Sequence, residues 1–241
     1  ERLAGQTARA LSEAADQLRG NGHDDSPLAV HTHALEGATV DTVWAQAETL
    51  DAGLLVIGRR GSSPLHHLVI GTTAERLLRK APRPLLVVQN EAQQPYQRVL
   101  LPLDFSPWSE QAIALTRRLF PLAHLVLMHS FAIPFEEKLR FAGVDDATLD
   151  HYRERARRDA RDHLEALVDR HGLQPDEFTL CLTEGDAPLH IVGTARERAC
   201  DLIVIGKHGR QAAEELLLGS VTRQVLAEAE CDVLVSTVRQ A

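Results

Sequence analysis

The stretch LIVIGKHGRQAAEELLLGSV, residues 202–221, decides how this chain folds. Its first four residues form a short apolar run rich in Ile and Val, which predicts a buried strand. Three glycines follow at the spacing Gly206-x2-Gly209-x9-Gly219, and Ser220 comes directly after the last of them. A helix that opens at such a glycine presents free amide groups and the positive end of its dipole to an anion. The stretch therefore predicts a phosphate-binding turn between a strand and a helix.

The same element occurs 148 residues earlier in the chain, where residues 54–73 read LLVIGRRGSSPLHHLVIGTT. Its glycines are Gly58, Gly61 and Gly71, and Thr72 stands in the place of the serine. The match needs no gap over about fifty residues, which indicates a tandem duplication.

The second copy is expected to be a complete domain in which strands alternate with helices. Apolar runs predict strands at 98–103, 124–129, 178–182, 202–205 and 233–235, and helical periodicity predicts helices at 109–119, 146–171, 188–199 and 221–229. This alternation, with strands that are apolar on both faces, predicts a doubly wound α/β domain with a five-stranded parallel sheet.

The first copy begins too late to be complete. A helix is expected over 1–19 and a strand over 28–34, but nothing corresponds to the first two strands of the second copy or to the helix between them. We therefore expect two tandem domains, of which the first lacks its N-terminal β-α-β part in this chain. The expected boundaries are 1–92 for the first domain, 93–97 for a linker and 98–241 for the second domain. We expect the natural chain to supply about fifty further residues upstream.

Composition narrows the classes of partner. The 241 residues carry a formal net charge of -8, which argues against general nucleic-acid binding but leaves room for one anionic ligand held by backbone amides. No apolar run approaches the roughly 20 residues that cross a bilayer. The cysteines lack metal or redox spacing and are expected to be free thiols, which favours a cytoplasmic protein. They are Cys181, Cys200 and Cys231.

A second motif lies at the end of the first strand of the complete copy, in the sequence Pro102-Leu103-Asp104-Phe105-Ser106. Ligands of doubly wound sheets bind at the carboxyl ends of the strands, where the strand order reverses. Asp104 is therefore a candidate acceptor for a base or a ribose. The alternative is that Asp104 only caps the following helix, that the glycines only form turns, and that Ser220 is only an N-cap.

Together these motifs resemble the nucleotide-binding branch of the universal stress protein family. That branch carries Pro-x-Asp-[Phe/Gly]-Ser after its first strand and Gly-x2-Gly-x9-Gly-[Ser/Thr] after its fourth. The resemblance covers residues 97–238 and, for the later part of a first domain, 1–89. It implies two tandem Rossmann-like domains, the second of which would bind ATP with or without Mg²⁺. Their last strands, 85–88 and 233–235, would pair edge to edge as an internal pseudo-dimer. A homodimer is a further expectation.

The resemblance also assigns the site residues. Asp104 and Ser130 would border the adenine and ribose, and the remaining residues would line the nucleoside or hold the phosphates. The expected nucleotide-binding set is Pro102, Asp104, Ser130, Ile205, Gly206, Gly209, Gly219, Ser220 and Val221. A second site in the first copy would use Gly58, Gly61, Gly71 and Thr72.

The expected function is to sense or store a ligand in a stress response rather than to turn it over, because no base that could activate water is evident. Any ATP hydrolysis is expected to be slow, although Glu214 and Glu215 could reach a metal ion. The alternative is a stress-response scaffold that binds no nucleotide and acts through dimerisation and protein partners. His31 and His33 alternate on an expected strand, but no third metal ligand accompanies them, and His66-His67 are expected on a solvated loop.

Overall fold

The computed structural model describes residues 29–59, 70–91, 94–133, 136–209 and 218–237, together with Leu11 and Glu13. It divides into a first unit that ends at Gln46 and a second unit that starts at Ala47. The helix expected over 1–19 lies outside the described residues except for Leu11 and Glu13, which are both helical.

The elements of the described residues follow in chain order. The helices are α2 (Thr39–Thr49), α3 (Thr72–Lys80), α4 (Pro107–Leu119), α5 (Glu136–Phe141), α6 (Asp146–His171), α7 (Ala187–Glu197) and α8 (Ser220–Glu228). The strands are β1 (Leu55–Gly58), β2 (Leu85–Val88), β3 (Arg98–Pro102), β4 (His124–Phe131), β5 (Phe178–Glu184), β6 (Leu202–Gly206) and β7 (Asp232–Ser236).

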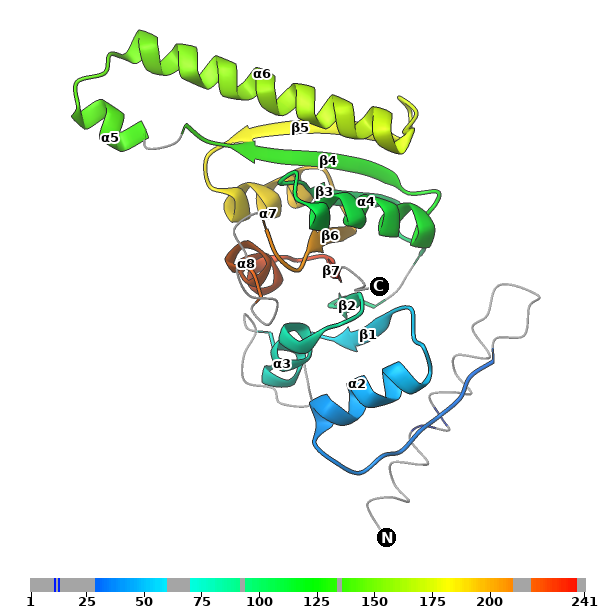
Figure 1. The fold of residues 1–241 in the computed structure, drawn as a ribbon. Helices are drawn as coiled ribbons and strands as arrows, with labels where there is room; N and C mark the ends of the chain where they lie inside the picture. Colours follow the sequence, from blue (N-terminus) through cyan, green and yellow to red (C-terminus); the bar gives the residue numbers. More distant parts are fainter. Residues whose placement is uncertain are drawn as a thin grey trace. The chain divides into compact units, whose positions relative to one another are not determined.

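The second unit is built on a seven-stranded sheet with the order β1-β2-β7-β6-β3-β4-β5 (Figure 1). The five strands of the second copy are contiguous and parallel, as expected of a doubly wound domain. The last strands of the two copies, β2 and β7, pair antiparallel, with Leu86 opposite Leu234 at the centre of the register. The predicted edge-to-edge pairing of the two copies is therefore confirmed.

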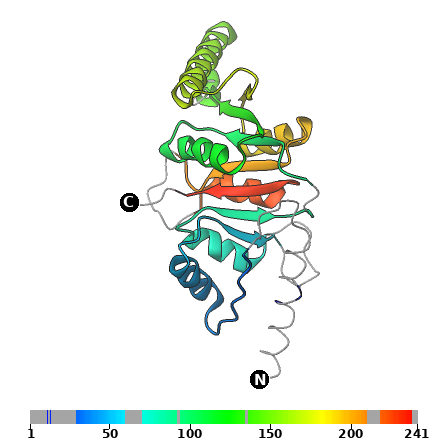
Figure 2. The same cartoon turned by 90° about the vertical axis from the view of Figure 1, so that its right-hand side faces the viewer.

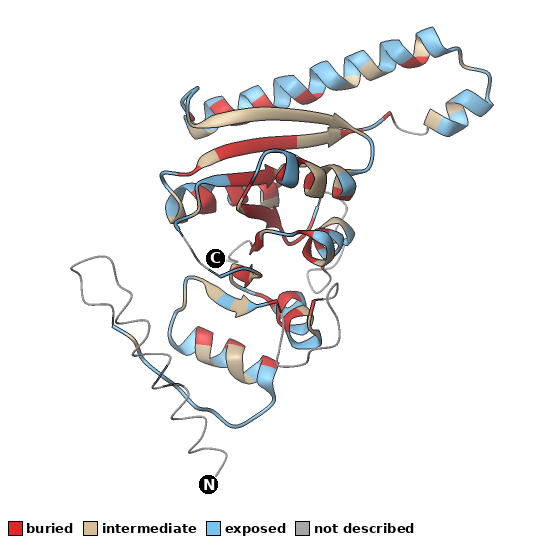
Figure 3. Cartoon of the chain, turned by 180° about the vertical axis from the view of Figure 1, so that it is seen from behind, coloured by how far each residue is buried: buried red, intermediate tan, exposed pale blue. Residues whose placement is uncertain are grey.

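Helices cover both faces of the sheet formed by the second copy (Figure 2). Helix α4 packs with α6, while α7 packs with α8. The four inner strands between these layers are largely buried, with Leu100, Leu127, Ile203 and Leu234 fully shielded from solvent, while the edge strand β5 is only partly buried. Figure 3 shows the same contrast, with buried strands in the middle and an exposed outer face on α6. Burial on both faces explains why these strands read as continuous apolar runs.

One expected strand does not form. Residues 29–34, the described part of the strand expected over 28–34, have no strand structure. Its counterpart in the second copy is β5, which pairs with β4 along its whole length. Among the described residues of the first copy, only β1 and β2 are strands, so no strand beside this segment is seen to supply backbone partners.

The described residues contain no helix that is long and apolar enough to span a bilayer. They also contain no group of three or more side chains that could hold a metal ion, so a third ligand for His31 and His33 is not found in this part of the chain. His66 and His67 lie outside the described residues.

Candidate functional site

A cavity of about 530 Å³ lies where the carboxyl ends of β3, β4 and β6 meet the N-terminus of α8. All nine residues of the expected nucleotide-binding set line it. They come from four separate segments of the second copy, and the doubly wound topology brings these segments to one edge of the sheet.

Asp104 is held in place by its own turn. Its Oδ1 accepts hydrogen bonds from the Ser106 backbone amide (3.1 Å) and from the Ser106 hydroxyl (2.5 Å). The N-cap of α4 is Ser106, whose side chain accepts from the Ser109 amide at 3.3 Å. Ser106 therefore caps the helix, and Asp104 orients the capping residue while it lines the cavity.

The motif glycines of the second copy leave little space for a side chain. A Cβ atom on Gly209 would lie 2.9 Å from Oδ2 of Asp104. A Cβ atom on Gly206 would lie 3.0 Å from the Trp108 Cβ and 3.2 Å from the His208 carbonyl oxygen. The two motifs that the sequence indicates separately therefore lie close to each other at the cavity.

The N-terminus of α8 forms one side of the cavity. Gly219 is the N-cap, and Ser220 is the first residue of the helix. The alternative that Ser220 is the N-cap is therefore wrong. The Gly219 amide donates to the Lys207 carbonyl at 3.1 Å, which ties the end of the glycine loop to its start. The amides of the first turn that follows have no acceptor inside the helix, so they are available to an anion.

Several lining residues were not expected from the sequence. Thr222 donates its hydroxyl to the Gly206 carbonyl at 2.8 Å and so joins α8 to the end of β6. Nδ1 of His129 lies 2.6 Å from the Leu103 carbonyl oxygen, which requires a proton on that nitrogen. The His129 ring also lies 4.3 Å from the Phe105 ring, centroid to centroid. The unexpected lining residues are Leu103, Ser109, Met128, His129, Ala187, Ile191, His208 and Thr222.

Little in the sequence could have identified these residues. Met128 and His129 precede the expected Ser130 on the same strand, so their place near the carboxyl end of that strand could have indicated that they line the cavity. Ala187 and Ile191 lie on α7, and their residue types carry no chemical signature. Ser130 donates its hydroxyl to the Gly185 carbonyl at 2.8 Å, which fixes its orientation at the rim of the cavity.

The first copy repeats part of this geometry. Gly58 ends β1, Thr72 is the first residue of α3, and the Gly71 amide donates to the Arg59 carbonyl at 3.2 Å. Gly61 lies outside the described residues. Within the described part of the chain β1 is an edge strand, so no strand corresponding to β3 lies beside this turn.

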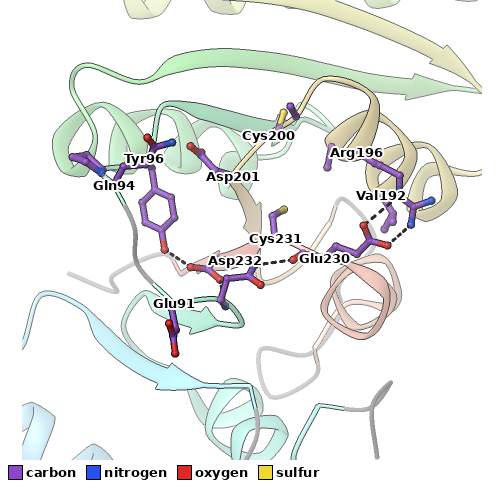
Figure 4. A pocket seen from close by; sticks show the side chains of 15 residues that line it. Glu91, Gln94, Tyr96, Val192, Arg196, Cys200, Asp201, Glu230, Cys231 and Asp232 are labelled. Atoms are coloured by element: carbon purple, nitrogen blue, oxygen red, sulfur yellow. Dashed lines mark hydrogen bonds and ion pairs between the residues drawn. The ribbon is translucent and has the colours of Figure 1, made fainter.

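A second cavity, of about 630 Å³, lies at the opposite ends of β6 and β7 (Figure 4). Two of its carboxylates, Asp201 and Asp232, bind the segment that joins the two copies, and a third, Glu230, pairs with Arg196. Asp232 accepts from the Gln89 amide (2.7 Å) and the Tyr96 hydroxyl (2.5 Å), and Asp201 accepts from the Gln97 amide (2.7 Å). This cavity is a structural joint between the copies rather than an open set of ligand-binding groups.

Two thiols line this joint. Burial raises the pKa of Cys200 from 9.0 to about 11 and that of Cys231 from 9.0 to about 12. Burial, followed by the hydrogen bond to Asp232, raises the pKa of Tyr96 as well. The structure contains all three cysteines as free thiols, as expected, although only Cys200 is fully buried.

These shifts predict a loss of stability at alkaline pH. A raised pKa means that the folded state holds the proton more tightly than the unfolded state, so the stabilisation is complete below pH 9. We expect the free energy of unfolding to fall from pH 9 through the folded-state values of about 11 and 12. Urea unfolding measured across this pH range tests the prediction. The variant Cys231→Ala should lose less of its free energy of unfolding over the same range. A free energy that stays constant from pH 9 to 11 would contradict the shifts.

The comparisons with known proteins agree with this architecture. The chain matches the model of the universal stress protein family over residues 2–89 and 95–237, which are the two copies. It is 28% identical over 201 residues to universal stress protein Rv1996 of Mycobacterium tuberculosis, covering 78% of this chain and 59% of that protein. It is also 28% identical over 212 residues to a universal stress protein of Mycolicibacterium smegmatis, covering 85% of this chain and 70% of that protein.

Solved structures share the fold. A universal stress protein from Archaeoglobus fulgidus superposes with a TM-score of 0.74 at 18% identity, covering 99% of this chain and 80% of that chain. A putative universal stress protein from Pseudomonas aeruginosa gives a TM-score of 0.63 at 22% identity, covering 95% of this chain and 77% of that chain. With both copies matched by one family and the fold shared with its solved members, this chain belongs to the universal stress protein family as a tandem-domain member.

Proposed function

We propose that this chain binds an adenine nucleotide, ATP, in the cavity of its second copy, and that it has a sensing or regulatory role in the stress response. One observation carries the proposal. The Asp104 carboxylate, the Gly209 backbone and the open first turn of α8 converge on one cavity of about 530 Å³. A cavity of this size suits a nucleotide-sized ligand.

The geometry suggests how the nucleotide is held. The phosphates would lie on the amides of Gly209, Ser220 and Val221, where the helix dipole is positive. A side chain on Gly219 would meet the Lys207 carbonyl oxygen, since its Cβ would lie 3.3 Å away, so the backbone itself forms the cradle. The ribose and base would lie toward Asp104 and Ser130, beside the apolar surface of Ile205. A Mg²⁺ ion would arrive bound to the phosphates.

The remaining parts of the proposal follow from this site. The boundaries 1–92, 93–97 and 98–241 are proposed for the two domains and their linker, and the protein is proposed to work in the cytoplasm. Binding without rapid turnover suits a protein that reports the presence of its ligand. Homodimerisation is proposed in addition to the internal pairing of β2 with β7.

Substitutions at the N-terminus of α8 should weaken nucleotide binding strongly. Gly219→Val places methyl groups against the Lys207 carbonyl, and Ser220→Tyr fills the cavity, so we expect at least a tenfold loss of ATP affinity for each. The measurement is the adenine absorbance released when the purified protein is denatured, together with the thermal shift in millimolar ATP and Mg²⁺.

The first copy supplies matched controls, because Gly71→Val and Thr72→Tyr make the same changes in the repeat that lacks a counterpart of Asp104. These variants should release nucleotide like the unsubstituted protein if the second copy alone binds it. No release and no thermal shift in any variant, including the unsubstituted protein, would refute the proposal and leave the scaffold that acts through protein partners.

A further inference from the structure

The two copies carry a buried cation at equivalent positions. Arg59 follows the glycine that ends β1, and Lys207 follows the glycine that ends β6. Arg59 is 8% exposed and Lys207 is 5% exposed. Burying a charged side chain is costly unless polar partners replace its water, so the partners of these two cations are informative.

Each cation reaches the other copy. The Arg59 guanidinium donates to the Ala229 carbonyl at 3.2 Å and also to the carbonyl of Ala227. Nζ of Lys207 donates to the Ala81 carbonyl at 3.3 Å. Ala229 is the C-cap of α8 and Ala81 is the C-cap of α3, and these two residues also occupy equivalent positions in the repeat. The contacts are therefore reciprocal, and the antiparallel pairing of β2 with β7 makes them so.

The chemistry of these contacts suits a helix C-terminus. The last carbonyls of a helix lack intrahelical donors, and the dipole places partial negative charge on them. A cation there satisfies the carbonyls and stabilises the helix. The main-chain carbonyl of Arg59 accepts a hydrogen bond from the amide of Gly71, the N-cap of α3. In the same way, the carbonyl of Lys207 accepts from the amide of Gly219, the N-cap of α8. Each residue thus anchors its own glycine loop through its backbone and the other copy's helix through its side chain.

We propose that Arg59, which belongs to the first copy, is a positioning residue for the nucleotide site of the second copy. The inference rests on the proposed function and deepens it. Helix α8 has nine residues, and its two ends are held by different copies. The Arg59 guanidinium holds the C-terminal carbonyls, while the N-terminal amides line the cavity. By holding one end of a short rigid helix, Arg59 sets where the amides at the other end lie, and Lys207 does the same for α3.

Three variants test the positioning role. Arg59→Met removes the donors and the charge, and Arg59→Lys keeps the charge with fewer donors. The matched control is Arg83→Met, because Arg83 is another largely buried arginine of the first copy, and it donates to Asp51 (2.9 Å) and the Ala52 carbonyl (2.7 Å) within that copy. Each variant is examined for hydrogen exchange of the amides in 218–229 without nucleotide, and for ATP affinity by calorimetry.

We expect Arg59→Met to speed exchange across α8 in the nucleotide-free protein and to weaken ATP binding by about three- to tenfold. Arg59→Lys should lie between Arg59→Met and the unsubstituted protein in both measurements, while Arg83→Met should match the unsubstituted protein. If Arg59→Met does not fold, Arg59→Lys alone carries the comparison, since it keeps the charge.

The outcomes separate the two proposals. Exchange in 218–229 and ATP affinity that change equally in the Arg59 and Arg83 variants would overturn the positioning role. If the unsubstituted protein binds no ATP, the proposed function fails. In that case, faster exchange of α8 confined to the Arg59 variants would still support the positioning of the helix.

Discussion

Replacing Gly206 by valine is expected to lower the free energy of unfolding by about 2–3 kcal/mol. The added Cβ would lie 3.0 Å from the Trp108 Cβ and 3.2 Å from the His208 carbonyl oxygen. The first atom lies in the first turn of α4 and the second is a backbone atom, so neither is the free end of a side chain that moves aside at low cost. Urea unfolding followed by circular dichroism measures the change.

The control for Gly206→Val is Gly193→Ala in α7. A Cβ on Gly193 meets nothing within 4 Å, so this variant should stabilise the protein by about 0.5–1 kcal/mol through a better helix propensity. A Gly206→Val variant as stable as the unsubstituted protein would show that the end of β6 is not packed against α4 in this way.

Replacing Asp232 by alanine is expected to cost about 2–4 kcal/mol of folding free energy. Asp232 is 7% exposed, and its carboxylate accepts from the backbone amides of Gln89 (2.7 Å) and Asn90 (3.3 Å) and from the Tyr96 hydroxyl (2.5 Å). Alanine leaves these donors without their acceptor at the joint between the two copies. Thermal and urea unfolding measure the loss.

Asp186→Ala provides the comparison, because Asp186 caps α7 through one bond, from the Leu189 amide at 3.0 Å, and is exposed. Its loss should cost about 1 kcal/mol. Asp232→Ala should also bring the pKa of Tyr96 down, since the Asp232 carboxylate no longer raises it, although burial still does. Equal losses of stability in the two variants would mean that the linker segment does not depend on Asp232.

The repeat and the glycine spacing could be read from the sequence because both are local. Gly206, Gly209 and Gly219 occur at fixed distances along the chain, and the same distances recur 148 residues earlier. The apolar runs that became β3, β4, β6 and β7 could be recognised because strands buried on both faces need apolar residues throughout. The strand prediction for 28–34 was wrong over its described residues 29–34, because a local match to β5 does not show whether a neighbouring strand is there to pair with it.

Part of the membership of the candidate site was also readable, because the carboxyl ends of parallel strands meet at one edge of the sheet. The contact between Gly209 and Asp104 was not readable, since it depends on how closely the loops after β6 and β3 approach each other. His129 and Thr222 were missed for the same reason, because their hydrogen bonds are to main-chain carbonyls of other segments.

By itself, then, the sequence determined the duplication, the order of strands along the second copy and the two motifs that gather at the cavity, because each of these follows from local pattern and from topology. Only the tertiary structure decided that the side chains of Arg59 and Lys207 reach the other copy and donate hydrogen bonds at the C-terminus of its last helix. In the sequence they are two cations beside glycines. They become reciprocal partners of Ala229 and Ala81 because the antiparallel pairing of β2 with β7 turns each copy's helix C-terminus toward the other copy's loop.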